Sequence, residues 1–168
     1  MKLDTLEELL VHELRDLHSA ESQILEAGPK LAGRVKNPVM REAFVGHLQE
    51  TTDHVRRLDQ ILADLGASAA RQECHGMAGL IEESQKVLED GGTPEVMDAA
   101  LLCAVQRIEH CEIAGYGTAA SFTATLGMDR AEEMLRQRLV EEKRADETLG
   151  HLADGSVNRQ AAFLTVDA

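Results

Sequence analysis

Aromatic residues are nearly absent from this chain of 168 residues, which has no tryptophan, one tyrosine and three phenylalanines. Proline is also rare, with three residues in all. Strands are rich in alternating aromatic and β-branched residues, and no segment of that kind occurs here. The dominant residues, Ala, Leu, Glu, Arg and Gln, are strong helix formers. The composition therefore predicts an all-α protein.

Positive charge is scarce as well. The chain has 17 Lys and Arg against 30 Asp and Glu, a formal net charge of −13. Such a chain has little attraction for nucleic acid or for an anionic membrane surface, and we expect neither as a partner. Long hydrophobic runs are missing too, because the longest, residues 99–105, is far short of the roughly 20 residues of a membrane span.

Cysteine is limited to Cys74, Cys103 and Cys111, an odd number without a Cys-x-x-Cys pair. This usage argues against a disulfide framework and favours a reducing compartment. The first ten residues, MKLDTLEELL, have carboxylates within their apolar stretch and no small-residue cleavage site, so we predict no signal peptide. We therefore expect a cytoplasmic protein.

Apolar residues recur at helical spacing in four long segments. The first runs from an N-cap at Asp4 to residues 28–29 and continues, after a kink at Pro29, over residues 30–35. The others span residues 37–66, 93–127 and about 130–153, with a long connection at 67–94 that contains a short amphipathic segment at 77–88.

This order predicts a single domain over residues 1–168. It comprises a helical bundle at about residues 4–153 and a polar C-terminal tail at 154–168. Two short turns separated by one long crossover are typical of ferritin-like four-helix bundles. The predicted fold is therefore a ferritin-like four-helix bundle whose crossover contains a short fifth helix.

Charged and imidazole side chains lie within or beside the apolar stripes of all four segments. They are Asp16 and Glu21 in the first, His47, Glu50 and His54 in the second, Glu109 and Glu112 in the third, and Glu142 and Asp146 in the fourth. Carboxylates that converge in a core must share protons or a cation. Oxygen ligands with one or two imidazoles suit iron or manganese, and two bridged ions would neutralise the cluster.

The two halves of the chain repeat this layout. Asp16 and Glu50 are 34 residues apart, and Glu109 and Glu142 are 33 apart. A further donor follows the second carboxylate of each half at i+4. The repeat favours a dinuclear metal site over a network of ion pairs. The predicted ligands are Asp16, Glu50, His54, Glu109, Glu112, Glu142 and Asp146.

Several alternatives stay open. Glu21 or His47 would replace one of these ligands, or basic residues, chiefly Arg138, would balance the acidic core without metal. Tyr116 is expected to be buried with its hydroxyl bonded. Gly115 and Gly117 cost about 1 kcal/mol each inside a helix. They predict a close helix approach or a local π-type distortion.

The segments that contain these residues resemble the YciF-like (YciE/YciF) family of the ferritin-like superfamily. They are ELRDLHSAESQILEAGPKLA, AFVGHLQETTDHVRRLDQIL, CHGMAGLIEES, QRIEHCEIAGYGTA and EEKRADETL, in order over nearly the whole chain. The resemblance implies a bacterial, stress-associated four-helix protein. It also implies a rubrerythrin-like dinuclear metal site and a homodimer.

The chain departs from the usual diiron bundle, in which two helices carry Glu-x-x-His. Glu50 is followed at that spacing by Asp53, and the imidazole is delayed to His54. Asp146 follows the central carboxylate of the fourth segment where a histidine would be expected. The sequence Glu109-x-x-Glu112 does resemble the paired glutamates of rubrerythrins.

The resulting hypothesis is a redox protein, such as a ferroxidase- or peroxidase-like enzyme, in which two iron (or manganese) ions react with dioxygen or hydrogen peroxide under stress. The alternatives are a metal-free structural or interaction protein and an iron-storing one. From the repeat, Glu50 and Glu142 are expected to lie symmetrically across the ions and Asp16 to face Glu109. Removal of Glu21 is expected to leave the metal content unchanged.

Overall fold

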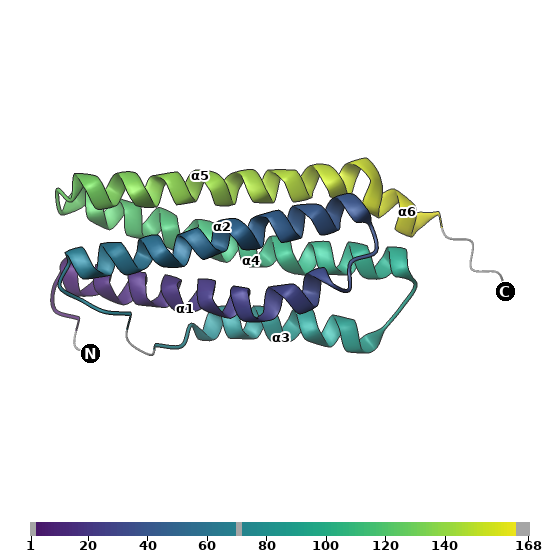
Figure 1. Cartoon of the computed structure of the whole chain (residues 1–168), viewed down its shortest axis with the longest axis horizontal. Helices are drawn as coiled ribbons and strands as arrows, with labels where there is room; N and C mark the ends of the chain where they lie inside the picture. The colour runs from purple at the N-terminus through teal and green to yellow at the C-terminus, as the bar shows by residue number, and fades with distance from the viewer. Residues whose placement is uncertain (1–2, 70–71, 164–168) are drawn as a thin grey trace.

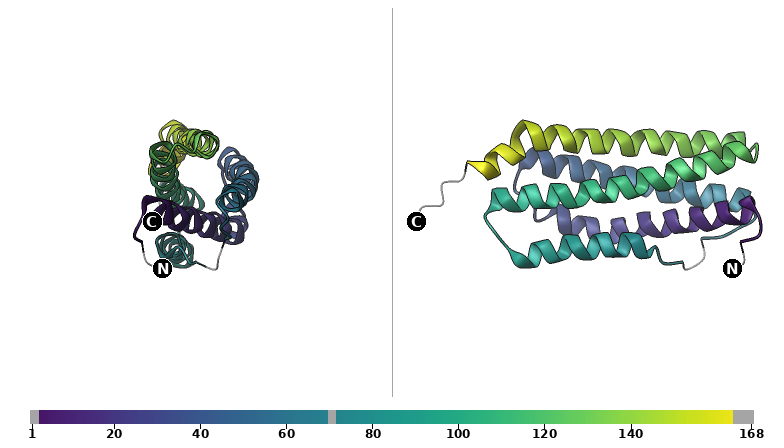
Figure 2. Two further views of the ribbon diagram at one scale, coloured as in Figure 1. Left: turned by 90° about the vertical axis from the view of Figure 1, so that its left-hand side faces the viewer. Right: turned by 180° about the vertical axis from the view of Figure 1, so that it is seen from behind.

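The computed structural model describes residues 3–69 and 72–163, and the regular elements in these ranges are all helices. They are α1 (Leu6–Ala32), α2 (Pro38–Asp64), α3 (His75–Asp90), α4 (Pro94–Thr125), α5 (Asp129–Leu152), the π-helical segment η1 (Ala153–Val157) and α6 (Asn158–Ala162). The long helices α1, α2, α4 and α5 lie side by side, and α3 lies in the crossover against α1 and α4 (Figures 1 and 2). The predicted four-helix bundle with a fifth helix in its crossover is confirmed.

Local capping signals explain where the helices begin. Thr5 caps α1: its Oγ1 accepts from the Glu8 N–H at 3.1 Å, while the Glu8 carboxylate accepts from the Thr5 N–H at 3.0 Å. The cap is therefore one residue later than Asp4. Asn37, where the second segment was predicted to begin, caps α2 with its Oδ1 accepting two backbone N–H groups. Pro29 does not end α1, which continues to Ala32.

The polar C-terminal tail predicted at residues 154–168 is helical as far as Ala162, where η1 and α6 continue the chain. Val157 is 1% exposed and packs in an apolar cluster with Leu101 and Leu149, which anchors this segment to the end of the bundle. The end of the predicted tail, residues 164–168, lies outside the described residues.

Two apolar clusters fill the two ends of the bundle. One includes Leu31, Met40, Phe44, Leu101, Leu102 and Leu149, and the other includes Leu14, Leu17, Leu58, Tyr116 and Leu135. On each long helix, the members of the two clusters are separated by a middle stretch. Apart from Asp98, the buried charged side chains lie in these middle stretches, so the fold brings them to one level of the bundle.

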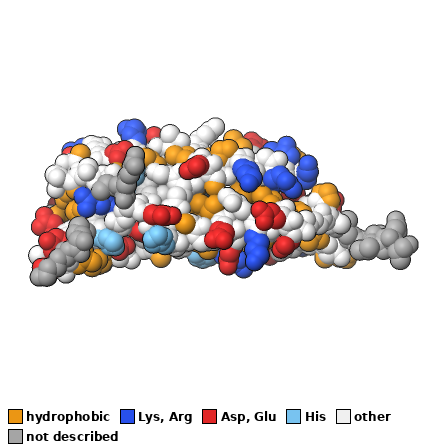
Figure 3. Space-filling view, turned by 90° about the horizontal axis from the view of Figure 1, so that it is seen from below, with side chains coloured by type: hydrophobic (Ala, Val, Ile, Leu, Met, Phe, Trp, Pro, Cys, Tyr) orange, Lys and Arg blue, Asp and Glu red, His pale blue; other side chains and the backbone are white. Residues whose placement is uncertain are grey.

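The outer surface carries charged side chains that are distinct from the buried ones. On the face seen from below, acidic, basic and apolar side chains are interspersed over the surface (Figure 3). Among the described residues, no helix combines the length and hydropathy needed to cross a membrane.

Gly115 marks a close approach between α4 and α1. A Cβ atom added to Gly115 would lie 2.7 Å from Leu17 Cδ2, and Leu17 is buried. The backbone there is ordinary α-helix, so the close approach, and not the π-type distortion, accounts for this glycine. The π geometry of the described chain lies instead at Ala153–Val157.

We expect Gly115→Val to lower the free energy of unfolding by about 1–3 kcal/mol, because the added methyl groups overpack the contact with Leu17. Gly46→Ala should instead raise it by about 0.5–1 kcal/mol, since a helical glycine is replaced and the new Cβ meets nothing within 4 Å. Urea denaturation measures both values. Equal destabilisation by the two variants would contradict this account.

Candidate metal centre

Glu142, in the middle of α5, belongs to two groups of potential metal ligands. One group consists of Glu21, His54 and Glu142, and the other of His47, Glu109, Glu112 and Glu142. In each group, one donor atom from every residue lies within 4.8 Å of the others. The two groups therefore join through Glu142 and take side chains from all four long helices.

The two carboxylate oxygens of Glu142 point to different imidazoles. Oε1 lies 2.9 Å from His54 Nδ1, and Oε2 lies 3.8 Å from His47 Nε2. The Glu21 Oε1 atom is 3.2 Å from the same nitrogen of His54, and the Glu109 Oε1 atom is 3.4 Å from His47 Nε2. A carboxylate that reaches one imidazole with each oxygen has the arrangement of a bridging ligand.

These acidic groups are buried without a Lys or Arg counterpart. Glu21 and Glu142 are 0% exposed, and Glu109 and Glu112 are 1% exposed. Among the described Lys and Arg residues, Arg138 is the one that is buried, but its Nη1 pairs with Glu141 Oε2 at 2.7 Å. Arg138 therefore pairs outside the two groups. The alternative in which Arg138 balances the acidic core without metal is not favoured by this contact.

Several oxygens of the cluster have no hydrogen-bond partner. Glu21 Oε2, Glu109 Oε2 and both carboxylate oxygens of Glu112 are buried in this state. A buried polar atom without a partner costs about 1–3 kcal/mol, and more when it is charged. The unpaired lone pairs point to cations as the missing partners, so the donor set fits a metal centre.

The surroundings favour the protonated form of several of these groups when no metal is bound. Burial, followed by the charge of Glu142, raises the pKa of Glu109 well above its ordinary value. Burial and the charge of Glu21 do the same to the pKa of Glu112. Burial alone would lower the pKa of His54, but the adjacent carboxylates Glu142 and Glu21 outweigh it and raise that pKa to about 10.

Of the seven predicted ligands, the structure brings four into the two groups: His54, Glu109, Glu112 and Glu142. Asp16, Glu50 and Asp146 belong to neither group. The Asp16 carboxylate accepts from Gln72 Nε2 at 3.4 Å, and the Asp146 carboxylate accepts from Gln106 Nε2 at 3.3 Å. The sequence predicted that Asp16 faces Glu109 across the bundle. The structure corrects this prediction, because Asp16 bonds to Gln72 and lies outside both groups.

Glu50 lies beside the groups instead of between them. One of its oxygens pairs with the Arg144 guanidinium, and the other is 4.0 Å from His47 Nδ1. Its expected symmetry with Glu142 is not observed, because Glu142 is fully buried whereas the Glu50 side chain is 38% exposed. The difference arises because Glu50 projects toward α5 at the surface.

Glu21 and His47 complete the two groups in place of the predicted ligands that lie outside them. Glu21 follows Leu17 at i+4 and Leu14 at i+7, so it continues the buried stripe of α1, whereas Asp16 does not. His47 follows the buried Phe44 at i+3. The sequence left both residues open as replacements for a predicted ligand. The apolar spacing of α1 was the signal that could have selected Glu21.

Tyr116 and Glu141 extend the cluster. The Tyr116 hydroxyl donates a hydrogen bond to Glu21 Oε1, and its ring centroid lies 6.0 Å from that of His54. The expectation of a buried tyrosine with a bonded hydroxyl is therefore correct. On the other side, Glu141 Oε2 lies 2.9 Å from His54 Nε2. This contact turns the other nitrogen of His54 toward Glu142, as a carboxylate commonly does for a ligating histidine.

Comparisons with known proteins agree with this fold. Residues 5–162 match a family described as a domain of unknown function, DUF892. Protein YciF of Escherichia coli (strain K12) is 41% identical over 162 residues, which cover 96% of this chain and 98% of YciF. The crystal structure of the E. coli stress protein YciF matches with a TM-score of 0.88 at 41% identity, over 92% of this chain and 98% of that one. The structure of YcfI from Rhodopseudomonas palustris matches with a TM-score of 0.86 at 36% identity, over 89% and 95%.

Proposed function

The chain belongs to the DUF892 family, and we propose that it is a dinuclear metal–carboxylate protein with redox activity toward dioxygen or hydrogen peroxide. The observation that carries the proposal is the position of Glu142, whose two oxygens reach separate imidazoles in two buried groups. The description of the E. coli relative as a stress protein supports a role under stress. We further propose a homodimer in the cytoplasm, in line with the family resemblance and the cysteine usage.

Charge balance favours two ions. The groups contain four carboxylates, from Glu21, Glu109, Glu112 and Glu142. Two divalent ions would balance four negative charges, whereas one would leave a net charge in a region without a buried basic partner. Carboxylate oxygens with a minority of imidazole nitrogens suit iron or manganese in preference to zinc or copper.

The side chains would divide the work as follows. Glu21 and His54 would hold one ion, His47, Glu109 and Glu112 would hold the other, and Glu142 would bridge them. The ions, when bound, would supply electrons to the oxidant and withdraw them from a donor. Glu141 orients His54, and the hydrogen bond from the Tyr116 hydroxyl restricts the rotation of the Glu21 carboxylate. The surrounding apolar clusters exclude water from both groups.

Metal analysis tests this proposal directly. Purified protein is incubated anaerobically with Fe(II) or with Mn(II), freed of unbound metal and measured by elemental analysis. We expect about two ions per chain, and the iron form should consume dioxygen or peroxide. A content below about one ion per chain would sink the proposal. Light scattering after size exclusion would show whether the chain forms a dimer or an iron-storing cage.

The structure also revises which acidic residue of α1 matters. Glu21→Gln should lower the metal content from about two ions to about one, because the ion held by Glu21 and His54 loses an anionic ligand. Asp16→Asn should retain both ions, since its carboxylate bonds to Gln72 and not to the groups. Elemental analysis of the two variants in parallel checks this prediction. The opposite result would place Asp16, as the sequence repeat indicated, among the ligands.

A further inference from the structure

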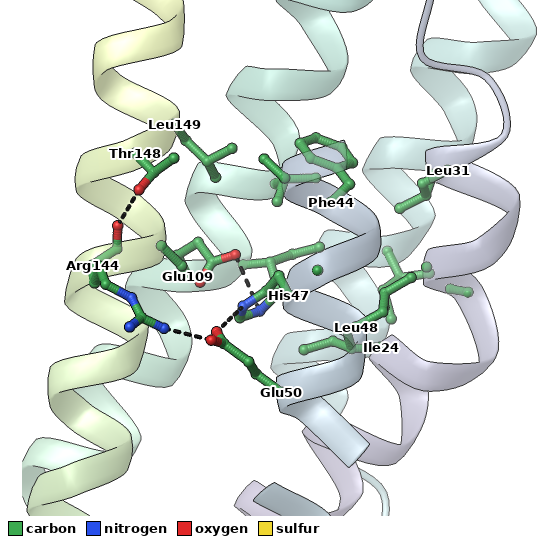
Figure 4. A pocket seen from close by; sticks show the side chains of 18 residues that line it. Ile24, Leu31, Phe44, His47, Leu48, Glu50, Glu109, Arg144, Thr148 and Leu149 are labelled. Atoms are coloured by element: carbon green, nitrogen blue, oxygen red, sulfur yellow. Dashed lines mark hydrogen bonds and ion pairs between the residues drawn. The ribbon is translucent and has the colours of Figure 1, made fainter. Parts of the chain in front are cut away.

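A largely apolar cavity of about 230 Å³ lies beside the candidate metal centre (Figure 4). All four long helices line it, with Ile24 and Leu31 from α1, Phe44 from α2, Ile108 from α4 and Leu149 from α5 among its walls. His47 and Glu109 line it as well. Because these two residues also belong to the second ligand group, the cavity and the candidate metal centre share a wall.

The size of the cavity limits its occupant. An apolar cavity of about 150 Å³ lined by Leu, Ile and Phe accommodates benzene. The present cavity is about half as large again, which suits a molecule of roughly eight to ten non-hydrogen atoms. Dioxygen or peroxide alone would leave most of this volume unfilled, so the cavity is larger than the oxidant requires.

The charges around the cavity disfavour an ionised ligand. Its lining contains one basic residue, Arg144, whose guanidinium is already paired with Glu50 at the surface. Deeper in, Glu109 is 1% exposed, so a charged group brought beside it would lose its hydration without gaining a cationic partner. An apolar chain that ends in an uncharged polar group avoids this cost. Glu109 Oε2 and both nitrogens of His47 make no hydrogen bond, so they are free to receive such a group.

We propose that this cavity binds a neutral apolar molecule of roughly eight to ten non-hydrogen atoms, such as a medium-chain alcohol, with its polar end toward His47 and Glu109. The molecule enters with its apolar body among the side chains of Phe44, Ile108 and Leu149. The binding stands on the cavity itself. Its consequence, that the polar end meets the metal ions and is the organic substrate, rests on the proposed function.

Two positions on different helices allow the cavity to be filled. Gly46 on α2 and Ala145 on α5 both line it, and a Cβ atom on Gly46 would meet nothing within 4 Å. Gly46→Phe and Ala145→Phe each add a large side chain to the cavity from a different helix. Gly79→Phe is the matched control, because Gly79 is an exposed helical glycine of α3 outside the lining and has equally open space at its Cβ.

The experiment is calorimetric titration of the metal-free full chain with linear primary alcohols from butanol to dodecanol. We expect affinity to rise about fourfold per methylene, the gain for burying a CH₂ group, and to level off near octanol as the cavity fills. Octanoate should bind at least about tenfold more weakly than octanol, because its carboxylate would lose its hydration in the cavity without gaining a cationic partner. Each plugging variant should lose at least about tenfold in octanol affinity at unchanged helicity, whereas Gly79→Phe should match the wild type.

Three results would each overturn the inference: no binding of any alcohol by the wild-type chain, octanol binding that survives both plugging variants, or octanoate binding more tightly than octanol. Two variants from different helices guard against the misfolding of one. Because the titration uses metal-free protein, alcohol binding without metal loading would refute the proposed function alone. Metal loading without alcohol binding would refute this inference alone.

Discussion

Glu142→Gln should abolish the binding of both metal ions. The variant keeps the size of the side chain but removes the charge that the two groups share. The content should fall from about two ions per chain to fewer than about 0.2, because loss of a shared ligand exceeds the 10–100-fold effect of changes outside the ligand set. Elemental analysis after anaerobic loading with Fe(II) or Mn(II) measures this content.

Glu147→Gln is the matched control, since Glu147 is an exposed carboxylate on the same helix. It should keep about two ions. Full loading of Glu142→Gln would contradict the bridging role. The metal-free alternative makes the opposite prediction for Glu142→Leu, which should then stabilise the fold, because a buried charge is replaced by an apolar side chain.

The fold was predictable because its signals are local. Asn37 followed by Pro38 announces the start of α2 through cap geometry that involves only neighbouring residues. The C-terminal helices η1 and α6 were not predicted, because they have no such local signal. Val157, which anchors them, is buried by contacts with distant residues such as Leu101. A segment with one or two anchoring residues has no periodicity to read.

The candidate site was predictable where a charged residue stands inside an apolar stripe. Glu142 lies seven residues from both Leu135 and Leu149, which are buried, so its burial follows from the helical repeat. Glu21 satisfies the same test against Leu14 and could have been preferred to Asp16 on that ground. In the structure, the pairs Glu21–His54 and Glu109–Glu142 are each separated by 33 residues, whereas Asp16 and Glu50, which defined the predicted repeat, lie outside both groups.

The side chains of α2 could not be ordered from sequence. His47, Glu50 and His54 lie along one edge of its stripe, and which of them enters the core depends on how α2 is rotated against α5. The pairing of Glu50 with Arg144 is a tertiary contact of this kind. The cavity is equally unpredictable, since a void is the space that packed helices leave unfilled.

Removal of metal should lower Tm by about 15–30 °C. Each ion stabilises the folded chain by about 4 kcal/mol at a free concentration about 1,000 times its Kd. A domain of this size shifts by about 2–4 °C per kcal/mol. Differential scanning calorimetry with and without a chelator measures the effect. An unchanged Tm would favour the metal-free structural protein.

The same measurement at pH 6 and pH 9 should separate the two forms further. The folded chain without metal raises the pKa of Glu109, Glu112 and His54 above their unfolded values of 4.5, 4.5 and 6.5. A raised pKa stabilises the fold fully below the unfolded value and loses this effect as pH rises through the folded one. For His54 the loss extends from pH 6.5 to about 10, so the metal-free form should be less stable at pH 9 than at pH 6.

The metal-bound form should show a different trend, because protons compete with metal for the same ligands and this competition weakens as pH rises. The difference in Tm between the two forms should therefore widen from pH 6 to pH 9. Glu112→Gln should flatten the pH dependence of the metal-free form, since it removes one of the groups with a raised pKa. Glu147→Gln should leave that dependence unchanged. A metal-free form that is more stable at pH 9 than at pH 6 would contradict the assignment of shared protons to this cluster, and with it the reason why the acidic core needs cations at neutral pH.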